Sequence, residues 1–197
     1  MNQKQPIWTT PSYGETEQNI LYEHFKEQNE ALTARVCRVS NAQGSLPIIL
    51  NLIRESGAVK VAAAGLSIID ESELERRARA AGINYQVNPP LEFMNTAQLG
   101  ISQYNLGIAE LGTLVQDACD IHTRLASMLP PVHIALVNIS KLVRTFEEAI
   151  DVLTQTYGAI LPEYLAYVTG PSRTSDIECV STIGVHGPEF LTIVCID

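Results

Sequence analysis

One stretch near the end of the chain combines a tight turn with an arginine and several hydroxyl side chains. Residues 170–174 read GPSRT and follow an apolar run at 164–169. If they lead into a helix that begins near Ser175, their backbone N–H groups and the helix dipole face an anion. Arg173 would add a forked donor for phosphate or carboxylate. Two interpretations stay open for this arginine: ligand binding, or a surface ion pair at a helix start. Ser175 and Glu178 form a capping box, which explains both without a ligand.

Two histidines are further candidates for chemistry. His186 lies between glycines in the segment 184–188, GVHGP, where the backbone approaches neighbours closely and an imidazole can act as general acid or base. The alternative is a turn residue whose ring nitrogen is satisfied within the protein. His133 stands at the entry of an apolar run, and a structural role is favoured there.

A lone acid is the third candidate. Glu110 lies in the small and apolar segment 107–113, GIAELGT, which also contains Thr113. If Glu110 is buried, its pKa is raised or it has a fixed partner, and either makes it a catalytic candidate. If the segment is an edge hairpin, Glu110 is solvated.

Several classes of function are excluded or unsupported. The formal net charge of −9, with scattered basic residues, disfavours nucleic-acid or anionic-membrane binding. The apolar runs are too short to span a bilayer, and the N-terminus does not read as a signal peptide, so a cytoplasmic location is expected. The four cysteines lack metal-binding spacing, and we expect them to be reduced and mostly buried. There is no metal, nucleotide or other cofactor motif, and no hydrolase triad.

The surrounding pattern predicts the elements that position these residues. Apolar runs at 59–64, 132–137, 164–169 and 190–196 predict strands, and residues 35–40 could form a further short strand. Helices are expected around 20–32, from Ser45 to Gly57, from a Ser72–Glu75 capping box to Gly82, and from a Thr145–Glu148 box to Gly158. Residues 97–117 predict short strands or a bent hairpin.

Strands that are apolar on both faces and alternate with capped helices indicate an α/β fold, with a mostly parallel sheet flanked by helices. Residues 1–14 are expected to be a flexible arm, and residues 15–197 a single domain. Ligands of open α/β sheets collect beyond the carboxyl ends of the strands, so we expect the three candidate loops at that edge.

Four segments in order, GIAELGTLV, LPPVHIALV, GPSRTSDIE and GVHGP, resemble the lactate utilization protein C family of LUD-domain proteins. The resemblance is close over roughly the last hundred residues. It highlights Glu110, Gly112, Thr113, His133, Gly170, Pro171, Ser172, Arg173, Thr174, Asp176, Glu178, His186 and Gly187. It implies the NagB/RpiA/CoA transferase-like fold, a role in oxidising L-lactate to pyruvate, and iron–sulfur partner proteins. This chain would be the small subunit without a cluster.

Three hypotheses follow. The first is a lactate-utilization component that acts in a complex, as a catalytic helper or an organising subunit. The second is an independent enzyme for an anionic metabolite such as a CoA ester, a sugar phosphate or a folate. Glu110 or His186 would act as acid, base or nucleophile. The ligand would be bound by Gly170, Ser172, Arg173, Thr174, Thr113 and His133. The third is an interaction domain without a ligand.

Overall fold

The computed structural model describes residues 6–174, 182–183 and 187–197. Its centre is a six-stranded sheet, sheet A, in which every neighbouring pair of strands is parallel. The strand order is β1-β12-β7-β4-β2-β3. The bounds are β1 Arg35–Val39, β2 Lys60–Ala64, β3 Asn84–Val87, β4 Leu99–Gln103, β7 Val132–Asn138 and β12 Phe190–Ile196. The expected α/β fold with a mostly parallel sheet is therefore confirmed.

A second, smaller sheet, sheet B, packs on one face of sheet A. Its order is β8-β5-β6-β9, with β5 Leu106–Ile108, β6 Thr113–Asp117, β8 Leu142–Val143 and β9 Leu165–Val168. The β5–β6 pair is the hairpin expected within residues 97–117. β9 corrects the prediction: it lies antiparallel to β6 at the edge of sheet B, and it is half-exposed rather than a buried strand of the parallel sheet.

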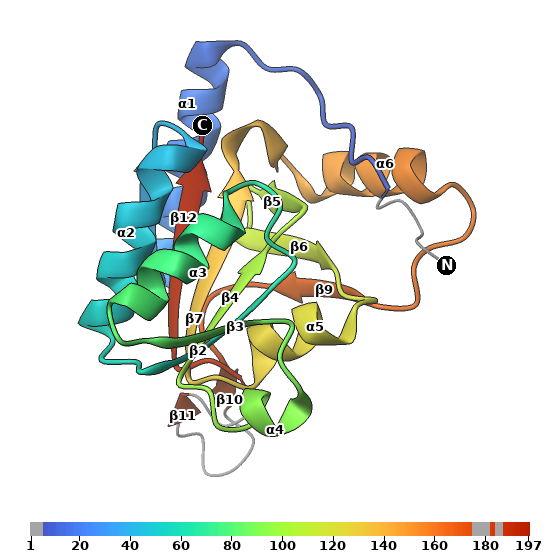
Figure 1. Cartoon of the computed structure of the whole chain (residues 1–197). Helices are drawn as coiled ribbons and strands as arrows, with labels where there is room; N and C mark the ends of the chain where they lie inside the picture. The colour runs from blue at the N-terminus through green and yellow to red at the C-terminus, as the bar shows by residue number, and fades with distance from the viewer. Residues whose placement is uncertain (1–5, 175–181, 184–186) are drawn as a thin grey trace.

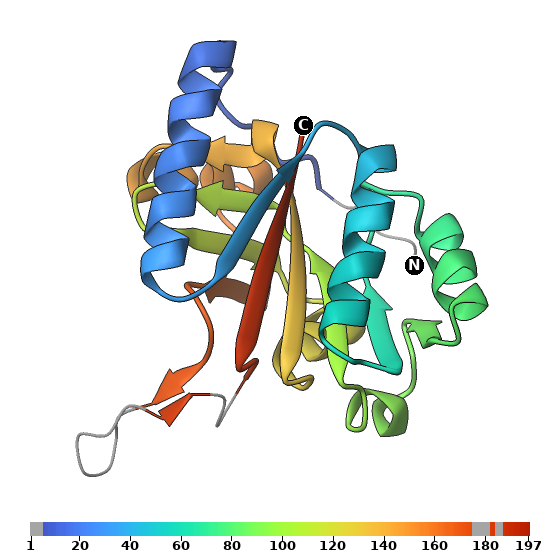
Figure 2. The same ribbon diagram turned by 90° about the vertical axis from the view of Figure 1, so that its left-hand side faces the viewer.

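Helices cover the sheets in layers (Figures 1 and 2). On one face of sheet A, α2 (Ala42–Glu55) and α3 (Glu71–Ala80) bury Leu46, Ile49, Ile53 and Leu74 against β-strand side chains. On the other face, α1 (Glu15–Ala31) packs beside sheet B. The helices α5 (Ile121–Met128) and α4 (Leu91–Met94) pack on the same face, against β2. α6 (Phe146–Tyr157) covers the outer face of sheet B.

The ends of the helices show which side chains stop them. The Thr145 cap of α6 is confirmed, because its side chain accepts a hydrogen bond from the Glu148 N–H, and α6 ends at Gly158. The predicted caps Ser45 and Ser72 are wrong. Asn41 caps α2 and Asp70 caps α3, each accepting from the N–H three residues on, so both helices begin earlier than the serines predict.

Other expectations have definite outcomes within the described residues. Cys195 is buried and Cys37 is half-buried, both on strands of sheet A, but Cys119 is exposed, so the prediction of mostly buried thiols is wrong for that residue. Within these ranges, no helix is both long and apolar enough to cross a membrane. Along the N-terminal segment, residues 6–14 form no helix or strand, yet Trp8 is buried against sheet B and α6.

Candidate functional site

Two of the segments singled out in the sequence meet in space. The N–H of Ser172 donates to the carbonyl of Pro188 at 2.9 Å. Gly187 lies so close to Ser172 that a Cβ built on the glycine would be 3.1 Å from the serine Cβ. The GPSR turn and the end of the GVHGP segment therefore form one loop cluster, directly before β12.

This loop cluster forms one wall of a cleft of about 430 Å3. The edge strand β9 with its flanks forms the floor, and α5 forms the opposite wall. The lining consists of residues 164–173, Ala118, Arg124, Ser127, Met128, Gly187 and Pro188. Among these described residues the charged ones are both arginines, Arg124 and Arg173, in a chain whose formal net charge is −9. The cleft is therefore suited to an anion.

Contacts with other elements hold the two arginines in place. Arg124 donates through Nη1 to the carbonyl of Ala118 at 3.0 Å, and its guanidinium carbon lies 3.9 Å from the ring centroid of Tyr164. Arg173 donates through Nη2 to the carbonyl of Leu32 at 2.7 Å and to Thr33 Oγ1 at 3.1 Å. A guanidinium has more N–H donors than these contacts use, so each arginine keeps donors for a ligand.

The contacts of Arg173 place it against the end of α1. Leu32 is the C-terminal cap of α1, so the guanidinium meets the carbonyl end of a helix, where a cation is favourable. Arg173 and Thr174 form the short strand β10, which pairs with β11 (Thr182–Ile183) in a separate two-stranded sheet. The predicted capping box and helix from Ser175, including Asp176 and Glu178, lie outside the described residues.

A buried polar cluster lies beside the cleft, between sheets A and B. His133 is 1% exposed, and its Nε2 lies 3.3 Å from Ser102 Oγ and 3.4 Å from the Tyr104 hydroxyl. Gln116 donates to Ser102 Oγ at 3.2 Å and to the Gln103 carbonyl at 2.7 Å. Burial lowers the pKa of His133 to about 4, so the ring is neutral at neutral pH. His133 does not line the cleft, and its position agrees with the structural role favoured from the sequence.

Burial raises the pKa of the Tyr104 hydroxyl in this cluster. On the side of the cleft, Ser127 of α5 is a lining residue, and its hydroxyl donates to the Arg124 carbonyl at 2.9 Å. α5 can approach β4 closely because β4 has a glycine there. A Cβ at Gly100 would lie 1.9 Å from the Ala126 carbonyl oxygen of α5. Gly100 thus sets the position of the helix that carries Arg124 and Ser127.

Four other predicted site residues lie in three different places. Gly170 and Ser172 line the cleft with Arg173. Thr113 is buried, and its hydroxyl lies 2.8 Å from that of Thr169, so it ties β6 to the end of β9. Glu110 is exposed at the β5–β6 turn and does not line the cleft.

The structure does not describe every predicted site residue in full. Thr174 is described only as part of β10, and His186 lies outside the described residues. The predicted edge of the sheet is wrong as well. The cleft is lined by Gly187 and Pro188, which directly precede β12, and the next residue, Glu189, donates to the carbonyl of Pro131 just before β7. The cleft therefore lies at the amino ends of these sheet A strands and not at their carboxyl ends.

Sequence reasoning missed α5 and with it Arg124. The available signal was Asp120, whose side chain caps α5 by accepting from the Thr123 N–H at 2.9 Å. A helix of eight residues shows little periodicity, so this cap was the main local indication. Within the described ranges there is no group of three His, Cys, Asp or Glu side chains that could hold a metal ion.

Comparison with known proteins connects this architecture to a family. The model of the LUD domain matches residues 22–196. An uncharacterized protein of Neisseria meningitidis is 30% identical over 157 residues, which cover 80% of this chain and 64% of that protein. Proteins named lactate utilization protein C are 36% identical over 100 residues in Bacillus velezensis (50% of this chain, 42% of that protein) and 37% over 94 residues in Bacillus subtilis (47% and 39%). The match thus covers less than two thirds of each relative.

A solved structure has the same fold. The crystal structure of a DUF162 family protein from Deinococcus radiodurans superposes with a TM-score of 0.66, covering 95% of this chain and all of that one. The sequences are 18% identical, so this likeness supports the fold alone.

Proposed function

Because this chain belongs to the LUD-domain family, we propose that it is a component of lactate utilization. The support is the similarity of about half of the chain to proteins named lactate utilization protein C. In this proposal it is the small subunit without an iron–sulfur cluster, in a cytoplasmic system that oxidises L-lactate to pyruvate. It acts there with iron–sulfur partner proteins.

In this proposal the cleft binds the carboxylate group of lactate or pyruvate. Lactate and pyruvate are carboxylates, and a guanidinium binds a carboxylate through paired hydrogen bonds. The observation that carries the proposal is that the described charged residues of the cleft are two arginines, both fixed by contacts to backbone carbonyls. A fixed donor loses little side-chain freedom on binding, which favours recognition of a small anion.

Titration calorimetry with L-lactate and pyruvate tests the cleft. We expect binding to the wild-type protein and a loss of about tenfold or more in affinity for Arg124→Gln and for Arg173→Gln, because each removes a charged donor. Arg76→Gln is the matched control, since Arg76 pairs with Glu73 on the exposed face of α3, away from the cleft. Equal affinities in all three variants would remove the cleft from the proposal.

Growth on L-lactate tests the role in the cell. A strain that lacks this protein should fail to grow on L-lactate as carbon source, and the wild-type gene should restore growth. The Arg124→Gln and Arg173→Gln genes should restore it poorly at equal protein abundance, whereas Arg76→Gln should restore it fully. Normal growth of the deletion strain would contradict the role itself.

The size of the cleft favours a second candidate, an independent enzyme that binds a larger anionic metabolite. A volume of about 430 Å3 exceeds what a three-carbon acid fills, and is in the range of metabolite pockets. A thermal-shift screen with CoA esters, sugar phosphates and folates separates the candidates. A binder of this kind whose stabilisation disappears in Arg173→Gln would favour the second candidate.

A further inference from the structure

A different cavity lies at the opposite edge of sheet A. It has a volume of about 290 Å3, and part of its wall comes from residues at or shortly beyond the carboxyl ends of three neighbouring strands. Ile68 follows β2, Gln103 ends β4 with Asn105 just beyond, and Asn138 ends β7. We call this the carboxyl-edge pocket, since it lies where the carboxyl ends of these strands meet.

The strand order makes this edge a favourable place for a ligand. From β2 the chain continues to β3 on one side, whereas from β4 it returns through sheet B to β7 on the other side. Loops that leave two adjacent parallel strands in opposite directions open a crevice between them, and open α/β sheets bind ligands in such crevices. The carboxyl-edge pocket adjoins this point, between the loops after β2 and β4.

The amide side chains of the pocket are oriented by backbone donors. Gln103 Oε1 accepts from the N–H groups of Ser67 and Ile68, at 2.7 and 3.0 Å. Asn105 Oδ1 accepts from the Asp117 N–H at 2.8 Å. Asn138 Oδ1 accepts from the Ser140 N–H at 2.8 Å.

These bonds determine which amide groups remain for a ligand. A backbone N–H can only donate, so its partner in each side chain must be the oxygen. The three oxygens are therefore engaged within the protein. What Gln103, Asn105 and Asn138 have left to offer is their NH2 groups, and these donate.

The charged residue of the pocket also donates only. Among the described lining residues Lys141 alone carries a charge, and its half-buried side chain donates to the carbonyl of Trp8. The carbonyl belongs to the N-terminal segment, and Pro6 to Trp8 line the same pocket. Three amide donors and an ammonium group suit a ligand rich in acceptors and negative charge.

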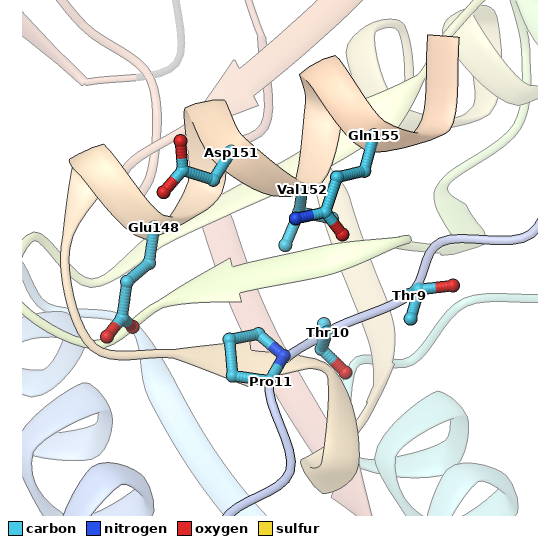
Figure 3. Close-up of a pocket in the computed structure, with 7 residues that line it drawn as sticks. All are labelled: Thr9, Thr10, Pro11, Glu148, Asp151, Val152 and Gln155. Carbon is cyan, nitrogen blue, oxygen red and sulfur yellow. The ribbon is translucent and has the colours of Figure 1, made fainter. Parts of the chain in front are cut away.

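The N-terminal segment that closes the pocket is anchored farther along. The Thr10 hydroxyl donates to the Ser140 carbonyl at 2.8 Å. Thr9, Thr10 and Pro11 then lie beside α6, where they line a smaller cavity of about 180 Å3 with Glu148 and other residues of that helix (Figure 3). Glu148 is engaged there by the Tyr13 hydroxyl and the Arg144 N–H, at 2.6 and 2.7 Å. The wall next to Lys141 is thus fixed by the protein's own contacts.

We propose that the carboxyl-edge pocket binds a small oxyanion, a phosphate or carboxylate group, held by Lys141 and the NH2 groups of Gln103, Asn105 and Asn138. The site is separate from the arginine cleft, which lies at the other edge of sheet A. Its volume suits a small metabolite or one end of a larger molecule. The Lys141 ammonium has three donors, so it can meet the anion while it still bonds to Trp8.

Titration followed by nuclear magnetic resonance reads this site directly, because each amide side chain gives its own NH2 signals. Inorganic phosphate and malonate are added separately, as phosphate and carboxylate probes. We expect the NH2 signals of Gln103, Asn105 and Asn138 to shift and saturate with at least one probe. Lys141→Met should lower the affinity for that probe by about tenfold or more. The probe that binds more tightly shows whether the site prefers a phosphate or a carboxylate group.

Two control variants separate this site from others. Lys26→Met removes a lysine that pairs with Glu30 on α1, and should leave the titration unchanged. Arg173→Gln, in the cleft, should leave it unchanged as well. The proposal is overturned if the three NH2 signals do not respond to either probe in the wild-type protein, which decides the matter even if Lys141→Met fails to fold. It is also overturned if Lys141→Met binds as tightly as the wild type, or if the response is lost in Arg173→Gln instead.

Discussion

The two edges of sheet A hold their positive charges in different ways. At the amino edge, Arg124 and Arg173 each donate to a backbone carbonyl beside a helix, at Ala118 shortly before α5 and at Leu32 just after α1. At the carboxyl edge, Lys141 is fixed to a carbonyl of the N-terminal segment. The first arrangement ties the cations to the packing of the fold, whereas the second ties one cation to a segment without helix or strand.

Because of this difference, we expect substitutions at the two edges to affect protein stability and ligand affinity differently. Substitutions at the amino edge should alter the free energy of unfolding together with any ligand affinity, because the same residues hold helices in place. Substitutions at the carboxyl edge should alter affinity with little change in stability. The two edges can therefore be compared by measuring both quantities for each variant.

Gly100→Val should have the largest effect, at the amino edge. A Cβ at this position would overlap the Ala126 carbonyl oxygen, so α5 must move away from β4. We expect a loss of about 3 kcal/mol or more in the free energy of unfolding, measured in urea. Gly14→Ala is the control, since a Cβ there meets nothing within 4 Å. A stable Gly100→Val protein would show that α5 is not held by this contact.

Acid should weaken the amino edge through His133. Its pKa is about 4 in the folded protein and about 6.5 when unfolded, so below pH 6.5 the unfolded chain takes up a proton that the folded chain does not. Stability is lost as pH falls from about 6.5 to about 4, by about 2–3 kcal/mol from this group. His133→Gln should lose less over the same range in urea unfolding experiments. Parallel pH profiles would contradict the burial of a neutral ring.

A pair of smaller changes compares the edges directly. Arg173→Gln removes hydrogen bonds to Leu32 and Thr33, and should cost about 1 kcal/mol in the free energy of unfolding. Lys141→Met removes one bond to the N-terminal segment and keeps the aliphatic stem, so it should cost less than Arg173→Gln. Differential scanning calorimetry checks the order. If Lys141→Met proves the more destabilising, the N-terminal segment belongs to the packed fold as much as α1 does.

Local patterns in the sequence predicted much of the fold. The runs that became β2, β7 and β12 are largely apolar on both faces, and α6 has a cap at Thr145 and a stop at Gly158. These features depend on neighbouring residues, so they can be read from the chain. The two wrong caps have the same origin, because Asn41 and Asp70 are better placed acceptors four and two residues before the serines.

The arrangement of the sites could not be read in this way. The pairing of β9 with β6 joins residues about fifty apart, and no local pattern distinguishes it from a strand of the parallel sheet. The residue type of Arg173 marks it as a candidate, but its hydrogen bond to Leu32 joins residues 141 positions apart in the sequence, which no local pattern predicts. The amide donors of the carboxyl-edge pocket depend on partners such as Ser67 and Asp117, which only the folded chain brings near.

β4 reaches both sites. Gly100 contacts α5 near one end of the strand, and Gln103 lines the carboxyl-edge pocket at the other, about 10 Å away. The Gln103 carbonyl also accepts from Gln116 in the cluster beside the cleft. A strand buried along its length transmits a displacement rather than absorbing it. Any coupling along β4 is reciprocal: an anion that tightens binding at one edge is itself held more tightly, by the same factor, once the other edge is filled.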